Sequence, residues 1–330
     1  MSSIFESGTL RVNMELFDHS CIELCCQTLA LIGLVKITLF FWQIITKGYQ
    51  YLIRSSKRDF KEYQGTNSWA IISGGSEGIG KEFGLVLGRA GFNICLISRS
   101  IEKLNNARAD ILNENSSIEV RVIQHDFLDP SEMAYDRIMS KIGLPGEDIA
   151  ILVNNVGLIV YDYHHHHRDQ DLRKYINIGC MPQAILTKRF LPKLIHRTKR
   201  SAIVNLSSYA GFHPSPGRAM YCATKAFNDY LSQGLSEEYK ESVDILSFRP
   251  RYISTPLTHN IKPSFSVLTT QEAVECCLRD LGKERYTIGS WRHAIDTWYQ
   301  DLWSLNSMLR NRMKISVATL KDRSLILNKQ

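Results

Sequence analysis

The sequence predicts an α/β fold, a single Rossmann-type doubly wound parallel sheet with an N-terminal hydrophobic anchor helix and a C-terminal amphipathic helical tail. Two observations predict the sheet. Short apolar runs alternate with longer helical patterns between residues 66 and 290, and a polar cluster follows each run. Because the runs are apolar almost throughout, they are typical of parallel strands that helices cover on both faces. Open sheets of this kind bind ligands beyond the carboxyl ends of their strands, so the polar clusters predict the site.

The composition is that of an ordinary globular chain. Its 330 residues are 44% hydrophobic and 22% charged, which excludes a collagen, a coiled coil and a mostly disordered chain. A net charge of +7 is too small for the concentrated basic stripe of a nucleic-acid-binding protein, so we expect no nucleic-acid partner. The eight cysteines contain no C-x₂-C pair, and we expect free thiols in a reducing compartment.

The N-terminal part is organised around one apolar segment. Residues 1–23 precede it, residues 24–46 contain a single charge, Lys36, and residues 47–65 form a basic linker. A helix over residues 24–46 extends about 35 Å, enough to cross a hydrocarbon core of roughly 30 Å. The basic residues downstream place the rest of the chain in the cytosol. The alternative is a buried or interfacial helix, because Lys36 lies near the middle of the segment.

The C-terminal tail, residues 291–330, is basic and amphipathic. Its apolar residues recur at steps of three and four, which predicts one apolar helix face: Trp291, Ile295, Trp298, Leu302, Leu305, Leu309 and Met313. Two alternatives stay open. The helix docks on the main domain or on a second subunit, or it lies in the headgroup layer of a membrane, which tryptophan and basic residues favour.

The main domain, residues 66–290, contains six apolar runs and no composition break. The runs are Trp69–Ile72, Phe92–Ser98, Ile118–Ile123, Ile149–Val153, Ala202–Leu206 and Val243–Phe248. The first run ends in the loop Ser73–Gly80, whose glycines permit a tight turn and let the backbone approach a pyrophosphate at the start of a helix. The loop lacks the Gly-Lys-Ser/Thr ending of nucleoside-triphosphate loops, which disfavours a kinase or an ATPase.

The end of the second run indicates which dinucleotide the loop binds. An acidic residue there binds the ribose 2′-hydroxyl of NAD, whereas an arginine accommodates the 2′-phosphate of NADP. This chain has Arg99 at that point and Lys103 one helical turn further. The two cations favour NADPH. The alternative is a solvated charge at a strand end.

A tyrosine and a lysine carry the strongest chemical signal. Tyr221 and Lys225 are four residues apart, so a helix places them on one face. A tyrosine with its usual pKa of about 10 is a poor acid–base catalyst, and an adjacent ammonium lowers that pKa. Ser208, at the end of a neighbouring run, offers a hydroxyl to a substrate carbonyl. The alternative is a surface pair that shares a helix face by chance.

Together these landmarks resemble the short-chain dehydrogenase/reductase superfamily. The resemblance runs from residue 69 to residue 257 and rests on the glycine loop, Asp126, Asn154-Asn155-Val156-Gly157, Ser208, Tyr221-x₃-Lys225 and Pro250-x₄-Thr255. Further similarity lies in the hydrophobic N-terminal segment, the basic linker and the runs Leu96–Ser100, Leu152–Gly157, Gln233–Tyr239 and Thr287–His293. On these features the chain most resembles, within the superfamily, the membrane-bound very-long-chain 3-oxoacyl-CoA reductases and the related 17β-hydroxysteroid dehydrogenases.

The resemblance implies a nicotinamide-dependent oxidoreductase with NADPH/NADP⁺ as its cofactor. Tyr221 would be the general acid, Lys225 would bind the nicotinamide ribose and lower the tyrosine pKa, and Ser208 would orient the substrate oxygen. The residues expected to bind the cofactor are Gly74, Ser76, Glu77, Gly78, Ile79, Gly80, Arg99, Lys103, Asp126, Asn155, Tyr221, Lys225, Ile253 and Thr255.

The resemblance also implies a lipophilic substrate, partners and a location. The first hypothesis is reduction of a 3-oxoacyl-CoA to the 3-hydroxyacyl-CoA in very-long-chain fatty-acid elongation. The second is a 17β-hydroxysteroid dehydrogenase or another lipophilic ketone reductase, and the third is a catalytically weak membrane scaffold. The expected location is the endoplasmic reticulum membrane with a cytosolic catalytic domain, and a homodimer and elongation-complex partners are the expected assemblies.

The chain departs from the superfamily pattern at one catalytic position. A fourth catalytic residue of the superfamily, an asparagine, falls on Gly179, and Asn177 lies two residues earlier. Either Asn177 takes the role, or backbone and water do, or the activity is reduced.

The run His164–His167 resembles a metal site, but adjacent side chains cannot all reach one ion, so we expect a solvated loop and no metal.

Overall fold

The computed structural model describes residues 19–54, 59–142, 146–301, 307, 309, 310, 313 and 314. The chain divides into two units, Met1–Arg54 and Ser55–Gln330. Several predicted features fall outside the described residues, namely most of the first segment (1–18), part of the basic linker (55–58), Leu302 and Leu305 of the tail helix, and the end of the tail (315–330).

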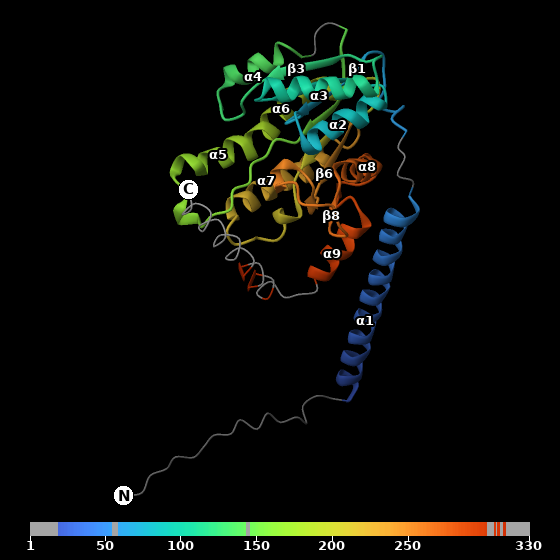
Figure 1. Ribbon diagram of the computed structural model, residues 1–330. Helices are drawn as coiled ribbons and strands as arrows, with labels where there is room; N and C mark the ends of the chain where they lie inside the picture. The colour runs from blue at the N-terminus through green and yellow to red at the C-terminus, as the bar shows by residue number, and fades with distance from the viewer. Residues whose placement is uncertain are drawn as a thin grey trace, which may run out of the picture. The chain divides into compact units, whose positions relative to one another are not determined.

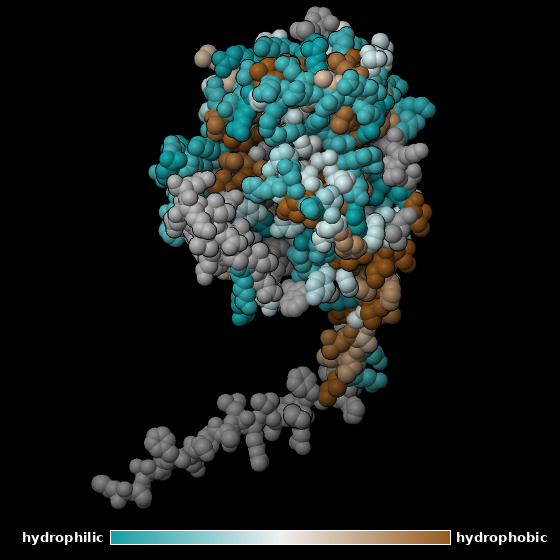
Figure 2. Space-filling model, viewed as in Figure 1, coloured by the Kyte–Doolittle hydropathy of each residue, from teal (hydrophilic) through white to brown (hydrophobic). Residues whose placement is uncertain are grey.

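The first unit contains one long apolar helix. Helix α1 spans His19–Gly48 and continues into a π-helical turn, Tyr49–Ile53. Within Ile22–Tyr51 an 18-residue window has a mean hydropathy of 2.0 and no buried residue. Figure 2 shows the hydrophobic residues that gather along α1. By length and composition this helix can cross a membrane, and its exposure disfavours the buried-helix alternative.

The second unit contains a parallel sheet of seven strands in the order β3-β2-β1-β4-β5-β6-β9. The strands are β1 (Ser68–Ser73), β2 (Asn93–Ser98), β3 (Val120–Gln124), β4 (Asp148–Asn154), β5 (Ser201–Leu206), β6 (Val243–Phe248) and β9 (Tyr286–Thr287). All six predicted strands are present. Two-residue strands were not predicted, neither β9 nor the separate pair β7 (Tyr252–Ile253) and β8 (Val267–Leu268).

Helices cover both faces of the sheet, as the doubly wound prediction requires (Figure 1). On one face lie α2 (Gly78–Arg89), α3 (Ile101–Glu114) and α8 (Thr270–Asp280). On the other lie α4 (Glu132–Met139), α5 (Asp169–Gly179), α6 (Met181–Ile195) and α7 (Ala219–Glu238). The strand order reverses between β1 and β4, which is where sheets of this kind open a ligand crevice at their carboxyl edge.

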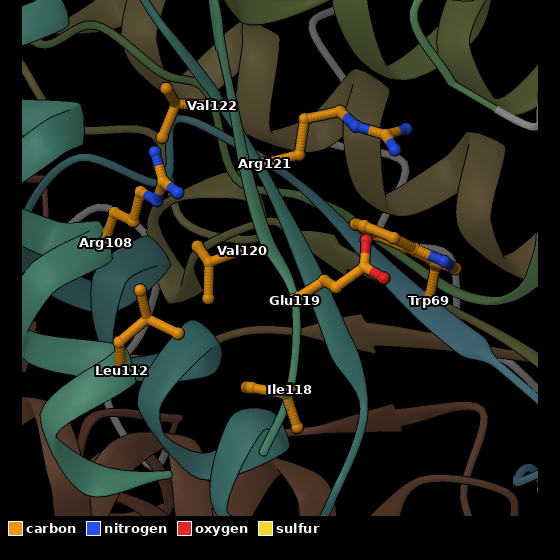
Figure 3. Close-up of a pocket in the computed structure, with 8 residues that line it drawn as sticks. All are labelled: Trp69, Arg108, Leu112, Ile118, Glu119, Val120, Arg121 and Val122. Atoms are coloured by element: carbon orange, nitrogen blue, oxygen red, sulfur yellow. The ribbon is translucent and has the colours of Figure 1, made fainter. Parts of the chain in front are cut away.

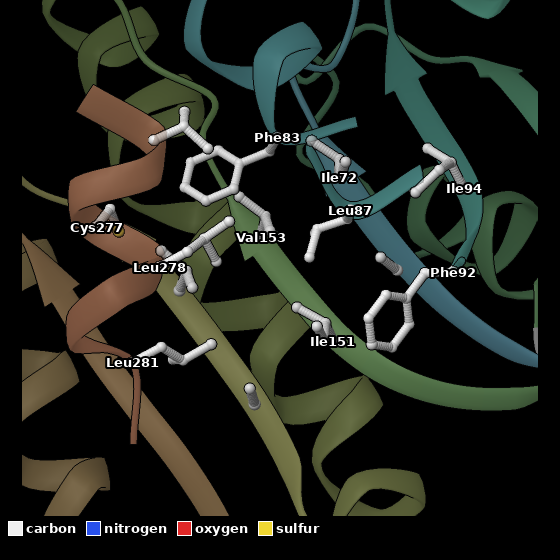
Figure 4. Packing of buried hydrophobic residues seen from close by; sticks show 14 of the residues in the cluster. Ile72, Phe83, Leu87, Phe92, Ile94, Ile151, Val153, Cys277, Leu278 and Leu281 are labelled. Carbon is white, nitrogen blue, oxygen red and sulfur yellow. The ribbon is translucent and has the colours of Figure 1, made fainter. Parts of the chain in front are cut away.

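Alternation along each strand fills both layers of the core. In β1, Ala70 and Ile72 face the layer that contains α2 and α8, whereas Trp69 and Ile71 face the opposite layer. Figure 4 shows the first layer, where Phe83 of α2 packs among residues of β1, β4 and α8. Two-sided burial therefore explains why the strands read as unbroken apolar runs.

A buried polar network joins the two central strands near their carboxyl ends. Asn154 of β4 and Asn205 of β5 lie opposite each other in the register. Asn154 Nδ2 donates to Asn205 Oδ1 (2.8 Å) and to Thr187 Oγ1 of α6 (3.0 Å). Asn205 Nδ2 in turn donates to Ser232 Oγ of α7 (2.9 Å). The network ties both strands to α6 and to α7, the helix that carries Tyr221 and Lys225.

The C-terminal helix α9 spans Trp291–Asp301 and is amphipathic as predicted. Three residues of its predicted apolar face are exposed: Trp291 (41%), Ile295 (50%) and Trp298 (54%). The Trp291 ring meets Phe265 edge to face, with ring centroids 5.7 Å apart. Exposure of these three residues disfavours docking of this face on the main domain and leaves an apolar surface for a second subunit or a membrane headgroup layer.

Candidate active site

The glycine loop after β1 is shaped by residues without side chains. Gly74 and Gly78 have positive φ values of 68° and 59°, which glycine adopts without strain. A Cβ at Gly80 would lie 2.2 Å from the Gly74 carbonyl oxygen, so only glycine fits there. Helix α2 begins at Gly78, and its N-terminus carries the partial positive charge that stabilises phosphates.

Asn155, directly after β4, holds this loop from the neighbouring strand. Its Nδ2 donates to the Gly74 carbonyl (2.9 Å), and its backbone N–H donates to Ser73 Oγ (3.1 Å). On the other side of the loop, the Thr255 methyl group lies 3.4 Å from where a Gly78 Cβ would be. The structure thus brings together three of the predicted cofactor-binding segments.

At the end of β2, Arg99 is exposed, and no carboxylate in the described part of the chain pairs with its guanidinium. Ser76 Oγ lies 2.9 Å from Ser98 Oγ, which places the glycine loop beside this strand end. Lys103, the second cation expected to bind the 2′-phosphate with Arg99, pairs with an acidic residue instead. Its Nζ donates to Glu77 Oε2 at 2.6 Å, an interaction that neutralises the one acidic side chain of the loop.

The remaining predicted cofactor residues lie around the same edge. Asp126 is exposed after β3, and its Oδ1 accepts from the Leu128 backbone N–H (3.0 Å). Ile253 of β7 is buried in the core, and Ile79 packs against that core from α2. Ile253 and Ile79 therefore support the loop by packing, whereas Asp126 presents a carboxylate to solvent.

Lys225 lies buried on α7 behind the site. Its Nζ donates to the Leu206 carbonyl at the end of β5 (2.7 Å) and lies 5.9 Å from the centre of the Tyr221 ring. A Cβ at Gly157 would be 3.4 Å from this Nζ, so the ammonium also approaches the loop after β4. Burial lowers the pKa of Lys225 to about 8, against an opposing effect of the Cys180 thiol.

Tyr221 faces Ser208, at the end of β5. Burial raises the pKa of the Tyr221 phenol, while interaction with the Ser208 hydroxyl and the charge of Arg218 lower it, and the net shift is upward. The downward shift expected from the sequence is therefore wrong for this structure, because desolvation outweighs the charges nearby. Ser208 is fixed by its own backbone contacts, since its Oγ accepts from Ala210 N–H (3.2 Å) and donates to the Pro250 carbonyl (3.4 Å).

Asn177 does not lie beside the tyrosine and lysine. Its Nδ2 donates to the Leu128 carbonyl (3.3 Å), in the loop that follows β3. Gly179 instead packs directly on Thr224 of α7, and the following residue, Cys180, is buried near Lys225. Of the residues offered for the fourth catalytic role, neither places a side-chain amide beside Lys225.

The four histidines form a short 3₁₀ turn, His164–His166, and its C-cap. His166 Nδ1 lies 2.7 Å from Asp162 Oδ1, and among the described residues no three metal-binding side chains form a cluster. A cavity of about 90 Å³ next to this turn is bordered by Asp162, Tyr163, His164, His167, Pro216, Gly217, Ala219, Met220 and Met313. The histidines therefore border an opening beside the start of α7.

A larger depression of about 540 Å³ lies elsewhere, between α3 and the outer strand β3 (Figure 3). It is lined by Trp69, Arg108, Leu112, Ile118, Glu119, Val120, Arg121 and Val122. None of these residues belongs to the carboxyl edge of the sheet. The depression is therefore separate from the candidate active site.

Comparison with known proteins decides the family. Residues 68–264 match the family model of short chain dehydrogenases. The chain belongs to the short-chain dehydrogenase family. The match spans every strand from β1 to β6 and the candidate site residues from Ser73 to Thr255, so the family's nicotinamide-dependent oxidoreductase chemistry applies to this site.

This short-chain dehydrogenase has well-covered relatives. The very-long-chain 3-oxoacyl-CoA reductase of Anas platyrhynchos is 36% identical over 256 residues, which are 76% of this chain and 80% of the relative. The human protein of that name is 36% identical over 237 residues, 70% of this chain and 74% of the relative. The similarity thus extends over most of both chains.

Solved structures of short-chain dehydrogenases share the fold. A 7β-hydroxysteroid dehydrogenase superposes with a TM-score of 0.68 at 22% identity, over 78% of this chain and 99% of that one. A short-chain dehydrogenase of Sphingobium yanoikuyae, solved in complex with NADPH, gives a TM-score of 0.60 at 26% identity, over 71% and 94% of the two chains.

Two residues at this site, Arg218 and Cys180, lie outside the sequence motifs. Arg218 immediately precedes α7, three residues before Tyr221, and Cys180 borders Lys225 from the start of α6. A cation one turn before the motif tyrosine is the only sequence signal that could have singled out Arg218. For Cys180 the sequence offers none, because its neighbour Lys225 lies on another helix.

Proposed function

We propose that this short-chain dehydrogenase is an NADPH-dependent reductase that converts a 3-oxoacyl-CoA to the 3-hydroxyacyl-CoA in very-long-chain fatty-acid elongation. One observation carries the proposal. Ser208, Tyr221 and Lys225 surround the end of β5 in a chain that is 36% identical, over most of its length, to reductases named for that substrate. The catalytic roles below follow from the contacts of these residues.

The residues at the carboxyl edge fit NADPH. The glycine loop offers backbone without side chains at the N-terminus of α2, which suits a pyrophosphate. The guanidinium of Arg99 is exposed and unpaired within the described chain, and Lys103 neutralises Glu77, so the acid of the glycine loop does not oppose a 2′-phosphate. The residues that would hold NADPH are Gly74, Ser76, Glu77, Gly78, Gly80, Arg99, Asp126, Asn155, Tyr221, Lys225 and Thr255, while Ile79 and Ile253 support the loop by packing.

NADPH, when bound, supplies a hydride to the carbonyl carbon of the substrate. Tyr221 supplies the proton. Its raised pKa keeps the phenol protonated at neutral pH, so the O–H can donate to the substrate oxygen as negative charge develops there. Ser208 Oγ, which accepts from the Ala210 N–H, turns its single O–H from the Pro250 carbonyl to the same oxygen and fixes its position.

Lys225 and the helix terminus then stabilise the phenolate that remains. The ammonium is held by the Leu206 carbonyl, close to Tyr221, and the first turn of α7 adds the positive end of the helix dipole. Gly179 has no side chain and the Asn177 amide contacts the Leu128 carbonyl instead. We therefore assign the reprotonation of Tyr221 to water molecules that backbone carbonyls hold in place.

The remaining assignments concern location and assembly. Helix α1 is proposed to span the endoplasmic reticulum membrane, with residues 66–290 as the catalytic domain on the cytosolic side and residues 291–330 as the tail. The length and hydropathy of α1 support the span. A homodimer and contacts with other elongation enzymes remain proposals that the sequence resemblance supports.

One assay tests the proposal against its rivals. The full-length protein, purified in detergent, is incubated with NADPH and either a long-chain 3-oxoacyl-CoA or a 17-ketosteroid, and NADPH oxidation is followed by absorbance. We expect turnover of the 3-oxoacyl-CoA. Turnover of the steroid alone would favour the hydroxysteroid dehydrogenase hypothesis, and NADPH binding without turnover of either ketone would favour the scaffold.

A further inference from the structure

Arg218, at the start of α7, is a cation without an acidic partner among the described residues. It precedes the first residue of α7 as its N-cap, and its side chain is half-buried. Its Nη1 donates to the Tyr161 hydroxyl (3.1 Å), and its guanidinium carbon lies 5.5 Å from the centre of the same ring. The second neighbour, Tyr252, is also a phenol.

No carboxylate in the described part of the chain compensates this charge. Asp162, the nearest acid in sequence to Tyr161, accepts from His166 instead, while its backbone N–H donates to the Gly217 carbonyl (2.9 Å). That backbone contact joins the loop after β4 to Gly217, the residue before Arg218, and so fixes Arg218 beside this loop. Arg218 Nε is buried and has no hydrogen-bond partner among the described residues. A desolvated N–H of this kind is costly to leave unpaired.

The arginine shares a helix turn with the catalytic tyrosine. Arg218 is the N-cap of α7 and Tyr221 is its third residue, two positions whose side chains lie close together at the start of a helix. The Arg218 charge lowers the pKa of the phenol, whereas the residues on either side of Arg218 border the separate small cavity beside the histidines. Arg218 therefore lies beside the group that would protonate the substrate.

We infer that Arg218 binds the second carbonyl of the substrate, the thioester oxygen of the 3-oxoacyl group. This inference rests on the proposed function. A 3-oxoacyl thioester carries two carbonyls separated by one methylene, so a ketone held at Tyr221 and Ser208 brings the thioester oxygen near the start of α7, where Arg218 lies. The guanidinium, which has phenols and no carboxylate among its described neighbours, suits such an oxygen.

The same geometry discriminates between substrates. A simple ketone or a 17-ketosteroid has no second oxygen one methylene away, so it offers the Arg218 guanidinium no acceptor. Sites built to hydrogen-bond a substrate group reject analogues that lack it. Arg218 thus makes 1,3-dicarbonyl thioesters better substrates than isolated ketones.

The test compares three substrates with the same acyl chain. They are a 3-oxoacyl-CoA, the 3-oxoacyl N-acetylcysteamine thioester, which lacks the phosphates of CoA, and a methyl ketone, which lacks the thioester. The full-length protein is assayed as wild type, Arg218→Leu, Arg218→Lys and Arg173→Leu. Arg173 is an exposed arginine of α5 without a contact of its own among the described residues, and it serves as the matched control.

We expect Arg218→Leu to lower kcat/KM for both thioesters by about 10- to 100-fold, the loss of a charge-assisted hydrogen bond. The loss appears mainly in KM, because the thioester oxygen is bound before and during reduction. Methyl ketone reduction changes by less than about 3-fold on the same reasoning. Arg218→Lys restores part of the loss, and Arg173→Leu changes none of the three rates.

Other outcomes overturn the inference. A loss confined to the CoA substrate would show that Arg218 binds a phosphate, and an equal loss on all three substrates would show a structural role. If Arg218→Leu does not fold, Tyr161→Phe, which removes the hydroxyl that holds the guanidinium, must give a smaller loss on thioesters only. Wild-type protein that reduces the methyl ketone but neither thioester would overturn the proposed function itself, whereas unchanged thioester kinetics in Arg218→Leu would overturn only the role of Arg218.

Discussion

Thr224 packs on the bare Cα of Gly179. A Cβ at Gly179 would lie 2.9 Å from the Cβ and Cγ2 atoms of Thr224, so α5 and α7 approach each other too closely for any side chain at this point. The asparagine expected at Gly179 is therefore absent for a packing reason, and Thr224 immediately precedes Lys225. The helix contact that excludes the asparagine also positions the lysine.

Gly179→Ala should lower the free energy of unfolding by about 1–3 kcal/mol, because the new methyl group overpacks the contact with Thr224. Thr224→Ala in the same chain should recover part of the loss, since the two side chains share one space. Gly234→Ala is the control: it lies in α7 with nothing within 4 Å, so it should be neutral or slightly stabilising. Urea denaturation of the three variants measures these differences. Equal losses at residues 179 and 234 would contradict the packing explanation.

Tyr221→Phe should reduce turnover by about 10²–10⁴-fold while folding and NADPH binding survive, because it removes the acid that protonates the substrate oxygen. Tyr230→Phe removes the hydroxyl of a tyrosine on the same helix that is 74% exposed, and it should leave the rate unchanged. Single-turnover rates with saturating NADPH make the comparison. A Tyr221→Phe enzyme at wild-type rate would remove the tyrosine from the mechanism.

Arg99→Asp should weaken NADPH binding far more than NADH binding, because the exposed, unpaired guanidinium is replaced by a charge that repels a 2′-phosphate. Arg108→Asp makes the same charge change at an exposed position of α3 and should leave the ratio of the two affinities as it is. Fluorescence titration with both cofactors gives the ratio. The assignment of Arg99 fails if both variants behave alike.

Lys225→Met should raise stability at pH 7 although it abolishes efficient turnover. The folded-state pKa of Lys225 is about 8 and its ordinary value is 10.5, so at neutral pH the buried ammonium costs on the order of 3 kcal/mol that methionine does not. Because a lowered lysine pKa makes the unfolded chain bind more protons between pH 8 and 10.5, the wild type gains stability across that range. The gap between the two proteins should therefore close as the pH rises. Thermal unfolding across this range tests it, and a gap independent of pH would contradict the burial argument.

Full-length protein should remain in membranes through alkaline carbonate washing, because α1 is long and apolar enough to insert. A chain that begins at Ser55 should bind anionic vesicles weakly through the exposed face of α9, and salt should release it. Trp298→Gln in the shorter chain should weaken that binding further. Vesicle flotation distinguishes these cases. Soluble full-length protein would contradict the anchor, and failure of the short chain to bind vesicles at low salt would contradict an interfacial role for α9.

The sheet could be predicted from the sequence because two-sided burial leaves unbroken apolar runs such as the one in β4. The glycine loop and the Tyr221–Lys225 spacing were visible for a similar reason, since each depends on residues close together in the chain. The two-residue strand β9 could not be predicted, because so short a run has no recognisable pattern.

Contacts between distant segments account for what the sequence missed. Arg218 acquires its setting from Tyr161 and Tyr252, which come from two other segments. The pairing of Lys103 with Glu77 joins α3 to the glycine loop and cannot be read from either. The rise in the Tyr221 pKa depends on burial by the whole fold, whereas the sequence showed only the neighbouring charge.

The amides of Asn154 and Asn205 favour the correct register of β4 and β5 during folding. If β4 and β5 paired one residue out of step, each amide would face an apolar layer with its hydrogen-bonding groups unmet, a penalty of about 1–3 kcal/mol for each group. Misaligned sheets are thereby disfavoured during assembly. Asn155 and Ser208, which follow these strands, come into line as the chain folds, so a ligand arrives at an edge that needs no further alignment.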